Sequence, residues 1–239
     1  MNRNINYLQV RLLTFLFILS PGIALSSCID PVVKQERNVG QFTGIKVGGA
    51  FEVVLSQTGK HRLVVEAEED LLEKVRTEVK GNVLHIDMEW DWSWKGNDDI
   101  IIYIDFKDLE SLEISGAADV RADTPIKAND LDIRVSGAGD MDLEVDANTM
   151  DVTVSGAADL RVSGSTDRQK VRLSGAGDYE AQHLKSNYTY AKASGAGTIV
   201  VYASEEIEAY ASGAGSVKYY GDPDREKSNA SGAGSISKR

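Results

Sequence analysis

The chain has 239 residues, of which 26% are charged and 42% are hydrophobic, and its formal net charge at pH 7 is −11. This composition is typical of a folded globular body and excludes an intrinsically disordered chain. The acidity excludes a nucleic-acid binder, because an acidic surface repels phosphate and releases no counterions from it.

Residues 1–27 have the pattern of a secretory signal peptide. Arg3 and Arg11 supply positive charge, the apolar run LLTFLFIL follows, and a Pro-Gly pair breaks the run before small residues appear. The run is too short to span a bilayer. Without these residues the chain keeps 24 Lys and Arg (26 minus two) against 37 Asp and Glu, a net charge of −13. We therefore predict an exported protein whose mature chain is more acidic than the full sequence.

Cys28 is the one cysteine of the sequence, and it closes the string LSSC. A leucine three places before a cysteine resembles the lipobox of bacterial lipoproteins, in which the thiol takes a diacylglyceryl group and becomes the mature N-terminus. The resemblance implies lipidation at Cys28, a membrane anchor of two or more acyl chains, and a place in the cell envelope at the outer membrane. The alternative is an ordinary signal cleavage near residues 24–27 that leaves a spare thiol, which exported chains rarely keep. With the lipid on Cys28, residues 28–40 would be a short lipid-anchored tether.

From residue 41 the sequence alternates as strands do. GIKV, FEVVLSQ, HRLVVEA and IIIYIDF place apolar side chains at about every second position. The string EEDLLEKV has helical spacing instead, with acids at its start, which the helix dipole favours. Gly-Asn pairs at 81–82 and 96–97 mark turns. Residues 41–110 are therefore expected to form a β-rich cap with one short helix.

A repeat governs residues 111–239. Seven copies or near-copies of SGAGD start 18 to 21 residues apart, at Ser115, Ser136, Ser155, Ser174, Ser194, Ser212 and Ser231. Each copy lies between two short strands with one apolar face, such as LDIRV before it and MDLEV after it. Strands this short bury their apolar face only when successive units stack. The fixed period predicts an all-β fold, a right-handed parallel β-helix or solenoid whose coils rise by about 4.8 Å each.

SGAGD is expected at a corner of every coil. There its glycines would permit a left-handed or bulged backbone, and its alanines would leave room for the next copy. In the later copies the apolar positions before the serine are mostly alanine, so we expect the solenoid to narrow. Tyr190 and Tyr210 have the outward parity of their strands. The last coil is expected to be an exposed edge, guarded by Lys238 and Arg239 or covered by a homo-oligomer formed through the solenoid ends.

These pieces together resemble the head GIN domain family of auto-transporter adhesins in bacterial envelopes. The matching strings are FTGIKVGGAFEVVLSQ, LVVEAEEDLLEKVRTEVKGNVLHID, DLESLEISGAADV and the serial SGAGD units, and they cover roughly residues 41–239. The resemblance implies a β-solenoid body and an exported or surface location. It supplies no catalytic residues.

The fifth position of the repeat forms a predicted ladder of carboxylates. Four consecutive copies have aspartate there, and Glu52 in GGAFE is a candidate for the same place; the aspartates are Asp119, Asp140, Asp159 and Asp178. Carboxylates about 5 Å apart repel one another, so solvent, backbone donors or a cation must relieve them. One solution is a calcium ladder, as in Gly-Gly-x-Gly-x-Asp rolls, although this chain has one such turn per coil and a longer period. The other is aspartates that accept local backbone N–H bonds. No other cofactor is expected.

Trp90, Trp92 and Trp94 alternate with polar residues in EWDWSWKG, which places all three indoles on one face of an extended strand. Such a row is a candidate sugar-stacking platform, because indole offers a large apolar plane and an N–H donor. The alternative is packing on a core or on a neighbouring subunit.

Signs of catalysis are weak. His61, His85 and His183 lie far apart and have no metal-ligand spacing, and GxSxG does not occur. We therefore expect a non-enzymatic envelope protein that binds glycans, surface polymers or protein partners through a repetitive face. Two alternatives stay open: a secreted polysaccharide-acting β-helix enzyme that uses the stacked aspartates, and a purely structural envelope protein.

Overall fold

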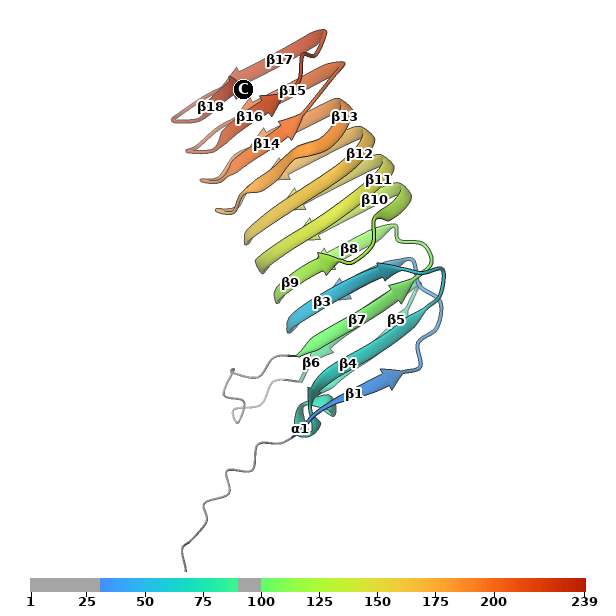
Figure 1. Cartoon of the computed structure of the whole chain (residues 1–239). Coiled ribbons are helices and arrows are strands. Elements are labelled where there is room, and N and C mark those ends of the chain that lie inside the picture. Colours follow the sequence, from blue (N-terminus) through green and yellow to red (C-terminus); the bar gives the residue numbers. More distant parts are fainter. Residues whose placement is uncertain (1–30, 90–99) are drawn as a thin grey trace, which may run out of the picture.

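The computed structural model describes residues 31–89 and 100–239. In this part of the chain 69% of residues are in strands and 2% in a helix, and the strands form a β-solenoid of about seven turns of stacked parallel coils (Figure 1). The expected all-β solenoid is confirmed. No helix within these two ranges is long and apolar enough to cross a membrane.

The elements are β1 (Val32–Arg37), β2 (Gly44–Val47), β3 (Ala50–Gln57), β4 (Arg62–Glu68), α1 (Glu69–Leu72), β5 (Val75–Lys80), β6 (Val83–Met88), β7 (Ile101–Phe106), β8 (Ser111–Ile114), β9 (Ala117–Ala122), β10 (Ile126–Val135), β11 (Ala138–Val154), β12 (Ala157–Leu173), β13 (Tyr179–Ala193), β14 (Thr198–Tyr202), β15 (Glu206–Ala211), β16 (Ser216–Tyr220), β17 (Arg225–Ala230) and β18 (Ser235–Lys238).

Each coil contributes strands to two faces. The entry face holds the strands that lead into the SGAG corners, which are β8, β10, the second halves of β11, β12 and β13, then β15 and β17, and it continues below β8 with β2 and β6. The exit face holds the strands that leave those corners, which are β9, the first halves of β11, β12 and β13, then β14, β16 and β18, and it continues below β9 with β3 and β7. All these pairings are parallel, so like residues stack on like residues.

The core follows from strand alternation. On the entry face Leu131, Ile133 and Val135 of β10 pair in register with Met150, Val152 and Val154 of β11, and none of these six side chains is more than 3% exposed. Intervening residues point to solvent. Since burial of apolar surface contributes about 25 cal/mol per Å², this continuous stack of short apolar strands is the main stabilising force.

The later coils replace these large residues with alanine on the entry face, as the sequence indicated. Ala191, Ala193 and Ala209 are fully or almost fully buried. On the exit face Tyr179 points inward and is completely buried, with its hydroxyl accepting a hydrogen bond from Nε2 of Gln169 at 2.6 Å. Burial raises the pKa of Tyr179 above its usual value. A large inward side chain on one face thus accompanies small ones on the other.

The SGAG corners stack through their backbones. The N–H of Ser136 donates to the carbonyl of Ile114 at 2.9 Å, and that of Ala138 donates to Gly116 at 3.0 Å, a pattern that recurs in the other copies. A Cβ at the second position would lie 1.7 to 2.1 Å from a carbonyl oxygen of the coil beneath in five copies, Gly116, Gly137, Gly156, Gly175 and Gly195.

Close approach, rather than a left-handed backbone, therefore requires glycine at the second position of these five copies. The expected left-handed conformation occurs at three glycines of the SGAGD units, Gly139, Gly213 and Gly232. The left-handed alternative of the expected left-handed or bulged backbone is thus confirmed at these three glycines and does not apply to the five stacked ones. The sequence pattern does not show how near the next backbone comes.

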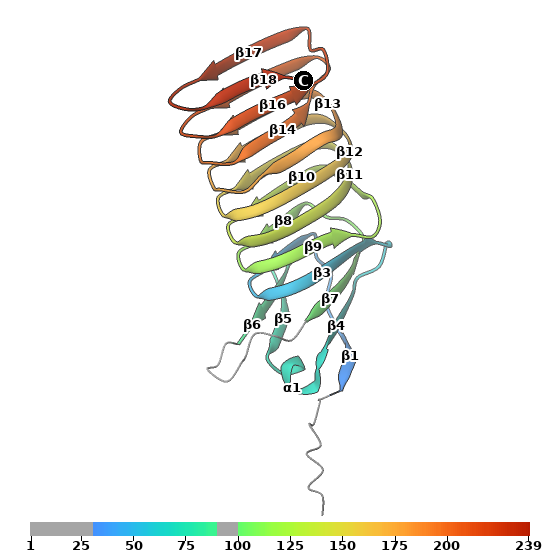
Figure 2. The same cartoon turned by 60° about the vertical axis from the view of Figure 1, so that its left-hand side comes forward.

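The stack of coils begins earlier in the chain than the repeat does. β2 and β3 form a coil whose corner is Gly48-Gly49-Ala50, and this coil lies directly beneath β8 and β9. Below this coil, β6 pairs in parallel with β2, and β7 pairs in parallel with β3 (Figure 2). The antiparallel strands β1, β4 and β5 and the single turn of α1 complete this end. Leu71 and Leu72 of α1 are buried.

The last coil is polar at positions that are apolar in the coils beneath. Glu226 and Ser228 of β17 are in register with Ile207 and Ala209, and every residue of β17 is exposed. Lys238 of β18 pairs with Asp222 at 2.5 Å. Polar and charged residues are a common protection of strand edges against pairing with other chains. Homo-oligomerisation through the solenoid ends stays a prediction.

Candidate functional site

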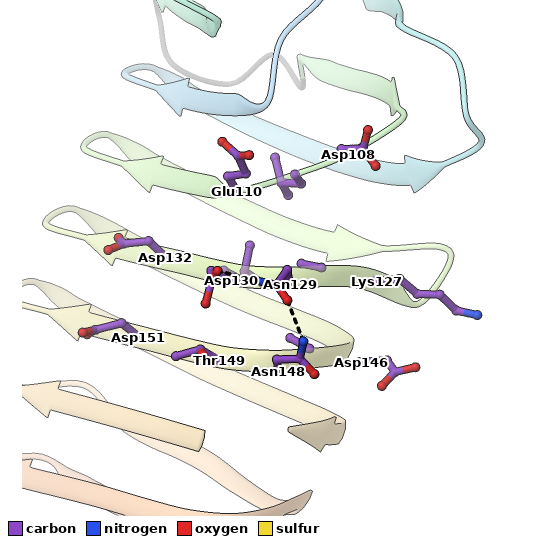
Figure 3. A pocket seen from close by; sticks show the side chains of 14 residues that line it. Asp108, Glu110, Lys127, Asn129, Asp130, Asp132, Asp146, Asn148, Thr149 and Asp151 are labelled. Atoms are coloured by element: carbon purple, nitrogen blue, oxygen red, sulfur yellow. Dashed lines mark hydrogen bonds between the residues drawn. The ribbon is translucent and has the colours of Figure 1, made fainter. Parts of the chain in front are cut away.

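A wide groove crosses three successive coils on the side of the solenoid. It has a volume of about 840 Å³ and is lined by Asp108 and Glu110 before β8, by residues 127–132 of β10, and by residues 146–149 and Asp151 of β11. Figure 3 shows its labelled carboxylates spread over these coils. Six carboxylates and one lysine line it: Asp108, Glu110, Asp130, Asp132, Asp146, Asp151 and Lys127. We call it the acidic groove.

One carboxylate of the acidic groove has a perturbed pKa. Desolvation raises the pKa of Asp132, Arg134 opposes the rise, and the charge of Asp151 adds to it. The guanidinium of Arg134 lies 2.7 Å from the Asp132 carboxylate. Asp151 is contacted by Arg172 at 2.9 Å and by Lys170 at 3.6 Å. The two neighbouring aspartates therefore have different surroundings although they occupy equivalent places in the repeat.

A ladder of polar side chains runs along the second corner of the coils, opposite the SGAG corners. Nδ2 of Asn148 donates to Oδ1 of Asn129 at 2.6 Å (Figure 3), and Nδ2 of Asn187 donates to Asp167 at 2.9 Å. The hydroxyl of Ser204 continues it to Asn187 at 3.0 Å. Sequence reasoning treated these turns as polar and missed the ladder. Its signal was an Asn or Asp recurring 19 to 20 residues apart at positions 129, 148, 167 and 187.

The predicted aspartate ladder exists on the exit face, just after the SGAG corners. Oδ1 of Asp119 accepts the backbone N–H of Asp140 at 2.9 Å, and Oδ1 of Asp159 accepts that of Asp178 at 2.9 Å. Oδ1 of Asp178 accepts the N–H of Thr198 at 2.7 Å. These three carboxylates therefore accept backbone N–H groups of the next coil. Glu52 lies in register with Asp119, the place that the sequence suggested for it.

The arrangement of the aspartates gives no support to a calcium ladder. Within residues 31–89 and 100–239 no group of three or more His, Cys, Asp or Glu side chains is placed to hold a metal ion. Asp119 and Asp140 do line a groove of about 330 Å³. Its other charged residues are Glu52, Asp142, Arg121 and Arg161, and Arg121 pairs with Glu52.

Trp90, Trp92, Trp94 and Cys28 lie outside the described residues, so their predicted roles stay predictions. The described strands before and after residues 90–99, β6 and β7, pair with β2 and β3. The N–H of Gly48 donates to the carbonyl of Ile86 at 2.8 Å, and the N–H of Glu52 donates to that of Ile100 at 3.0 Å.

The three histidines lie in different elements. His61 precedes β4 and contacts Phe42 edge-on at 4.7 Å between ring centroids, His85 is in β6, and His183 is in β13. The described structure therefore places the three histidines in separate segments.

Residues 41–223 match the family described as "Putative auto-transporter adhesin, head GIN domain". The chain belongs to this family. No curated protein matches the chain.

Solved structures share the fold of this head GIN domain. A putative adhesin from Bacteroides fragilis superposes with a TM-score of 0.85 at 24% identity, covering 87% of this chain and 97% of that one. A putative lipid binding protein from Parabacteroides distasonis gives 0.64 at 23% identity, with 87% and 96% covered. A putative adhesin from Parabacteroides merdae gives 0.66 at 18% identity, with the same two coverages. At these identities the likeness concerns the fold.

Proposed function

We propose that this head GIN protein is a non-catalytic adhesin of the cell envelope that binds an extended ligand along the side of its solenoid. Family membership and structural neighbours named as adhesins support the general class. The LSSC string supports export and a lipid anchor at Cys28, which would hold the solenoid at the outer membrane. The ligand classes are glycans, surface polymers and protein partners.

One observation carries the proposal: the exposed side chains of successive coils are in register, so grooves on the side of the solenoid extend over several coils. The acidic groove takes residues from three coils, and the groove beside the aspartate ladder also crosses coils. Coils are about 4.8 Å apart. A long polymer can therefore make equivalent weak contacts to several coils at once, which gives avidity without a deep pocket.

Trp90, Trp92 and Trp94 are our first candidates for contact, because they are the only tryptophans of the chain and alternate with polar residues. The test is a glycan and matrix-protein array probed with the purified protein, with and without calcium. The same array is probed with a Trp90→Ala/Trp92→Ala/Trp94→Ala variant. A matched control is Tyr220→Ala, which removes an exposed aromatic ring of β16.

Ligands that the protein binds and the tryptophan variant does not would support the adhesin function and assign its site. Binding that both variants keep would indicate that the binding site lies elsewhere on the solenoid. Loss of binding in calcium-free buffer would support calcium binding by the aspartate ladder. An array without any bound ligand would contradict the proposal and favour a purely structural envelope protein.

The second candidate function is a polysaccharide-acting enzyme, and the unequal surroundings of Asp132 and Asp151 favour it. A general acid and a general base need carboxyl groups in different environments. The test is release of reducing ends from polysaccharides incubated with the protein and with Asp132→Asn. Release that the variant abolishes would establish the enzyme, and no release from any polysaccharide would remove it.

A further inference from the structure

Three tyrosines form an outward aromatic surface on the entry face near the C-terminal end. Tyr188 and Tyr190 stand two residues apart on β13, and Tyr210 stands on the next strand, β15. The rings of Tyr190 and Tyr210 lie 5.5 Å apart between centroids and are tilted by 40°. All three side chains are half-buried. They therefore keep a fixed position and still expose part of each ring. We call this the tyrosine surface.

A row of cations borders the tyrosine surface on the side of the earlier coils. Arg168 and Lys170 of β12 are in register with Tyr188 and Tyr190. Arg172, the next outward residue of β12, is in register with Lys192 of β13. The guanidinium of Arg168 lies 4.5 Å from the centroid of the Tyr188 ring. A row of cations on β12 thus lies directly beside the two tyrosines of β13.

The carboxylates on the other side of the surface are already paired. Glu206 accepts two hydrogen bonds from Arg225, at 2.7 and 3.1 Å. Glu208 contacts Lys227 at 3.4 Å and accepts the hydroxyl of Tyr210 at 3.0 Å. These two acids are neutralised by the last coil, so they neither repel an anion nor recruit a cation strongly.

The remaining charge at the surface is positive. Four cations, Arg168, Lys170, Arg172 and Lys192, lie on β12 and β13, and three described carboxylates, Asp132, Asp151 and Asp167, interact with them. Asp151 contacts Arg172 and Lys170, and Asp167 lies 3.6 Å from Arg168. A local excess of cations is unusual in a chain whose net charge is −11. An acidic partner is thus attracted here and repelled by the acidic groove on the preceding coils.

We propose that the tyrosine surface binds a segment of an acidic polysaccharide. A groove of about 310 Å³ lies between these side chains, lined by Arg168, Lys170, Tyr188, Tyr190, Glu206 and Glu208 among others. Tyrosine rings offer apolar planes for the C–H faces of sugars and hydroxyls for their polar edges. Arg168 and Lys170 supply charge-assisted hydrogen bonds to a uronate carboxylate or a sulfate. This inference rests on the proposed function and names its ligand class and site.

The test is equilibrium binding of polygalacturonate, dextran sulfate and neutral dextran to the purified protein. Polygalacturonate and dextran sulfate distinguish a carboxylate from a sulfate as the acidic group. We expect at least one acidic polymer to bind at least tenfold more tightly than neutral dextran, with an affinity that falls as salt rises. Tyr188→Ala/Tyr190→Ala and Arg168→Gln/Lys170→Gln should each weaken that binding at least tenfold.

Three controls keep the test specific. Tyr188→Phe/Tyr190→Phe retains the rings and should keep most of the affinity. Tyr220→Ala removes an exposed tyrosine of the exit face and should change nothing. Circular dichroism and the Tm show whether each variant is folded. If Tyr188→Ala/Tyr190→Ala is unfolded, the phenylalanine variant and Arg168→Gln/Lys170→Gln still test whether the tyrosine surface is the binding site.

The possible failures are distinguishable. Equal affinity for acidic and neutral polymers, or tight acidic binding that both double variants retain, would overturn the assignment of the tyrosine surface. Binding of anionic lipid vesicles without binding of either acidic polymer would also overturn it. If the protein binds other array ligands but no acidic polymer, only this inference fails. If it binds nothing at all, the proposed function fails with it.

Discussion

A Cβ on Gly137 would lie 1.7 Å from the carbonyl oxygen of Gly116 in the coil beneath. This contact explains why the repeat keeps glycine after its serine: the two corner backbones approach so closely that no side chain fits between them. The same corner is tied by N–H donors on either side of the glycine, from Ser136 and Ala138. Glycine at this position therefore sets the stacking of one coil on the next.

Gly137→Ala should accordingly lower the free energy of unfolding by about 3 kcal/mol, the upper part of the range for overpacked sites. Gly40→Ala is the matched control, because a Cβ there meets nothing within 4 Å, and it should change stability by less than about 0.5 kcal/mol. Urea denaturation of both variants measures the difference. Equal stability of the two variants would refute the close-packing explanation.

The aspartate ladder makes a separate prediction. Asp159→Ala removes the acceptor of the Asp178 N–H and should cost about 1 kcal/mol. Asp159→Asn keeps an acceptor oxygen and removes a repulsive charge between Asp140 and Asp178, so it should cost less. Asp142→Ala, an exposed aspartate of the exit face, is the control and should be nearly neutral.

Thermal unfolding of the Asp159 variants, with and without calcium, checks this account. If the asparagine variant loses as much stability as the alanine variant, the charge of the ladder is stabilising and our explanation is wrong. A calcium-dependent rise in Tm that Asp159→Asn abolishes would identify the ladder as a cation site instead.

Much of the fold could be predicted from the sequence, because a repeat imposes its register on every coil. The alternation of Leu131, Ile133 and Val135 was sufficient to assign their inward direction, and the recurrence of SGAGD was sufficient to place it at a corner. What the sequence could not show was the distance between neighbouring corners, which decides the role of Gly137. It also could not show that Glu206 and Glu208 would be paired by the final coil.

The candidate sites were less predictable, for a physical reason. A surface is made by side chains from several coils, and its charge depends on pairings between them. Tyr190 and Tyr210 could be assigned an outward direction from parity alone. Their proximity, and the row of cations beside them, depend on the 18- to 20-residue offsets between later coils, which vary from one coil to the next.

Alkaline pH should destabilise the last two coils through Tyr219. Burial and a hydrogen bond with Glu226 raise the pKa of Tyr219 from 10 to about 12. A raised folded-state pKa leaves stability intact below pH 10 and removes it as pH rises from 10 towards 12. Tyr219→Phe should therefore lose less stability than the wild type across this interval. Urea denaturation at closely spaced pH values measures this, and parallel losses in the two proteins would contradict the prediction.

The polar last coil should act against end-to-end association. Glu226→Leu/Ser228→Val continues the apolar columns of Ile207 and Ala209 and should produce concentration-dependent oligomers in light scattering. Lys227→Gln, an outward position on the same strand, is the control and should leave the oligomeric state unchanged. If the wild type already associates as strongly as the double variant, the end of the solenoid is itself an assembly surface.

The most direct test of the central claim is adhesion by cells that express the full chain. Cells are allowed to settle on surfaces coated with the ligands selected by the array, and the fraction retained under flow is counted. We predict clear retention by cells that express the chain, and loss of retention with Cys28→Ser, because the unanchored protein would be released. Retention no greater than that of cells without the protein, on every coated surface, would contradict the adhesin account.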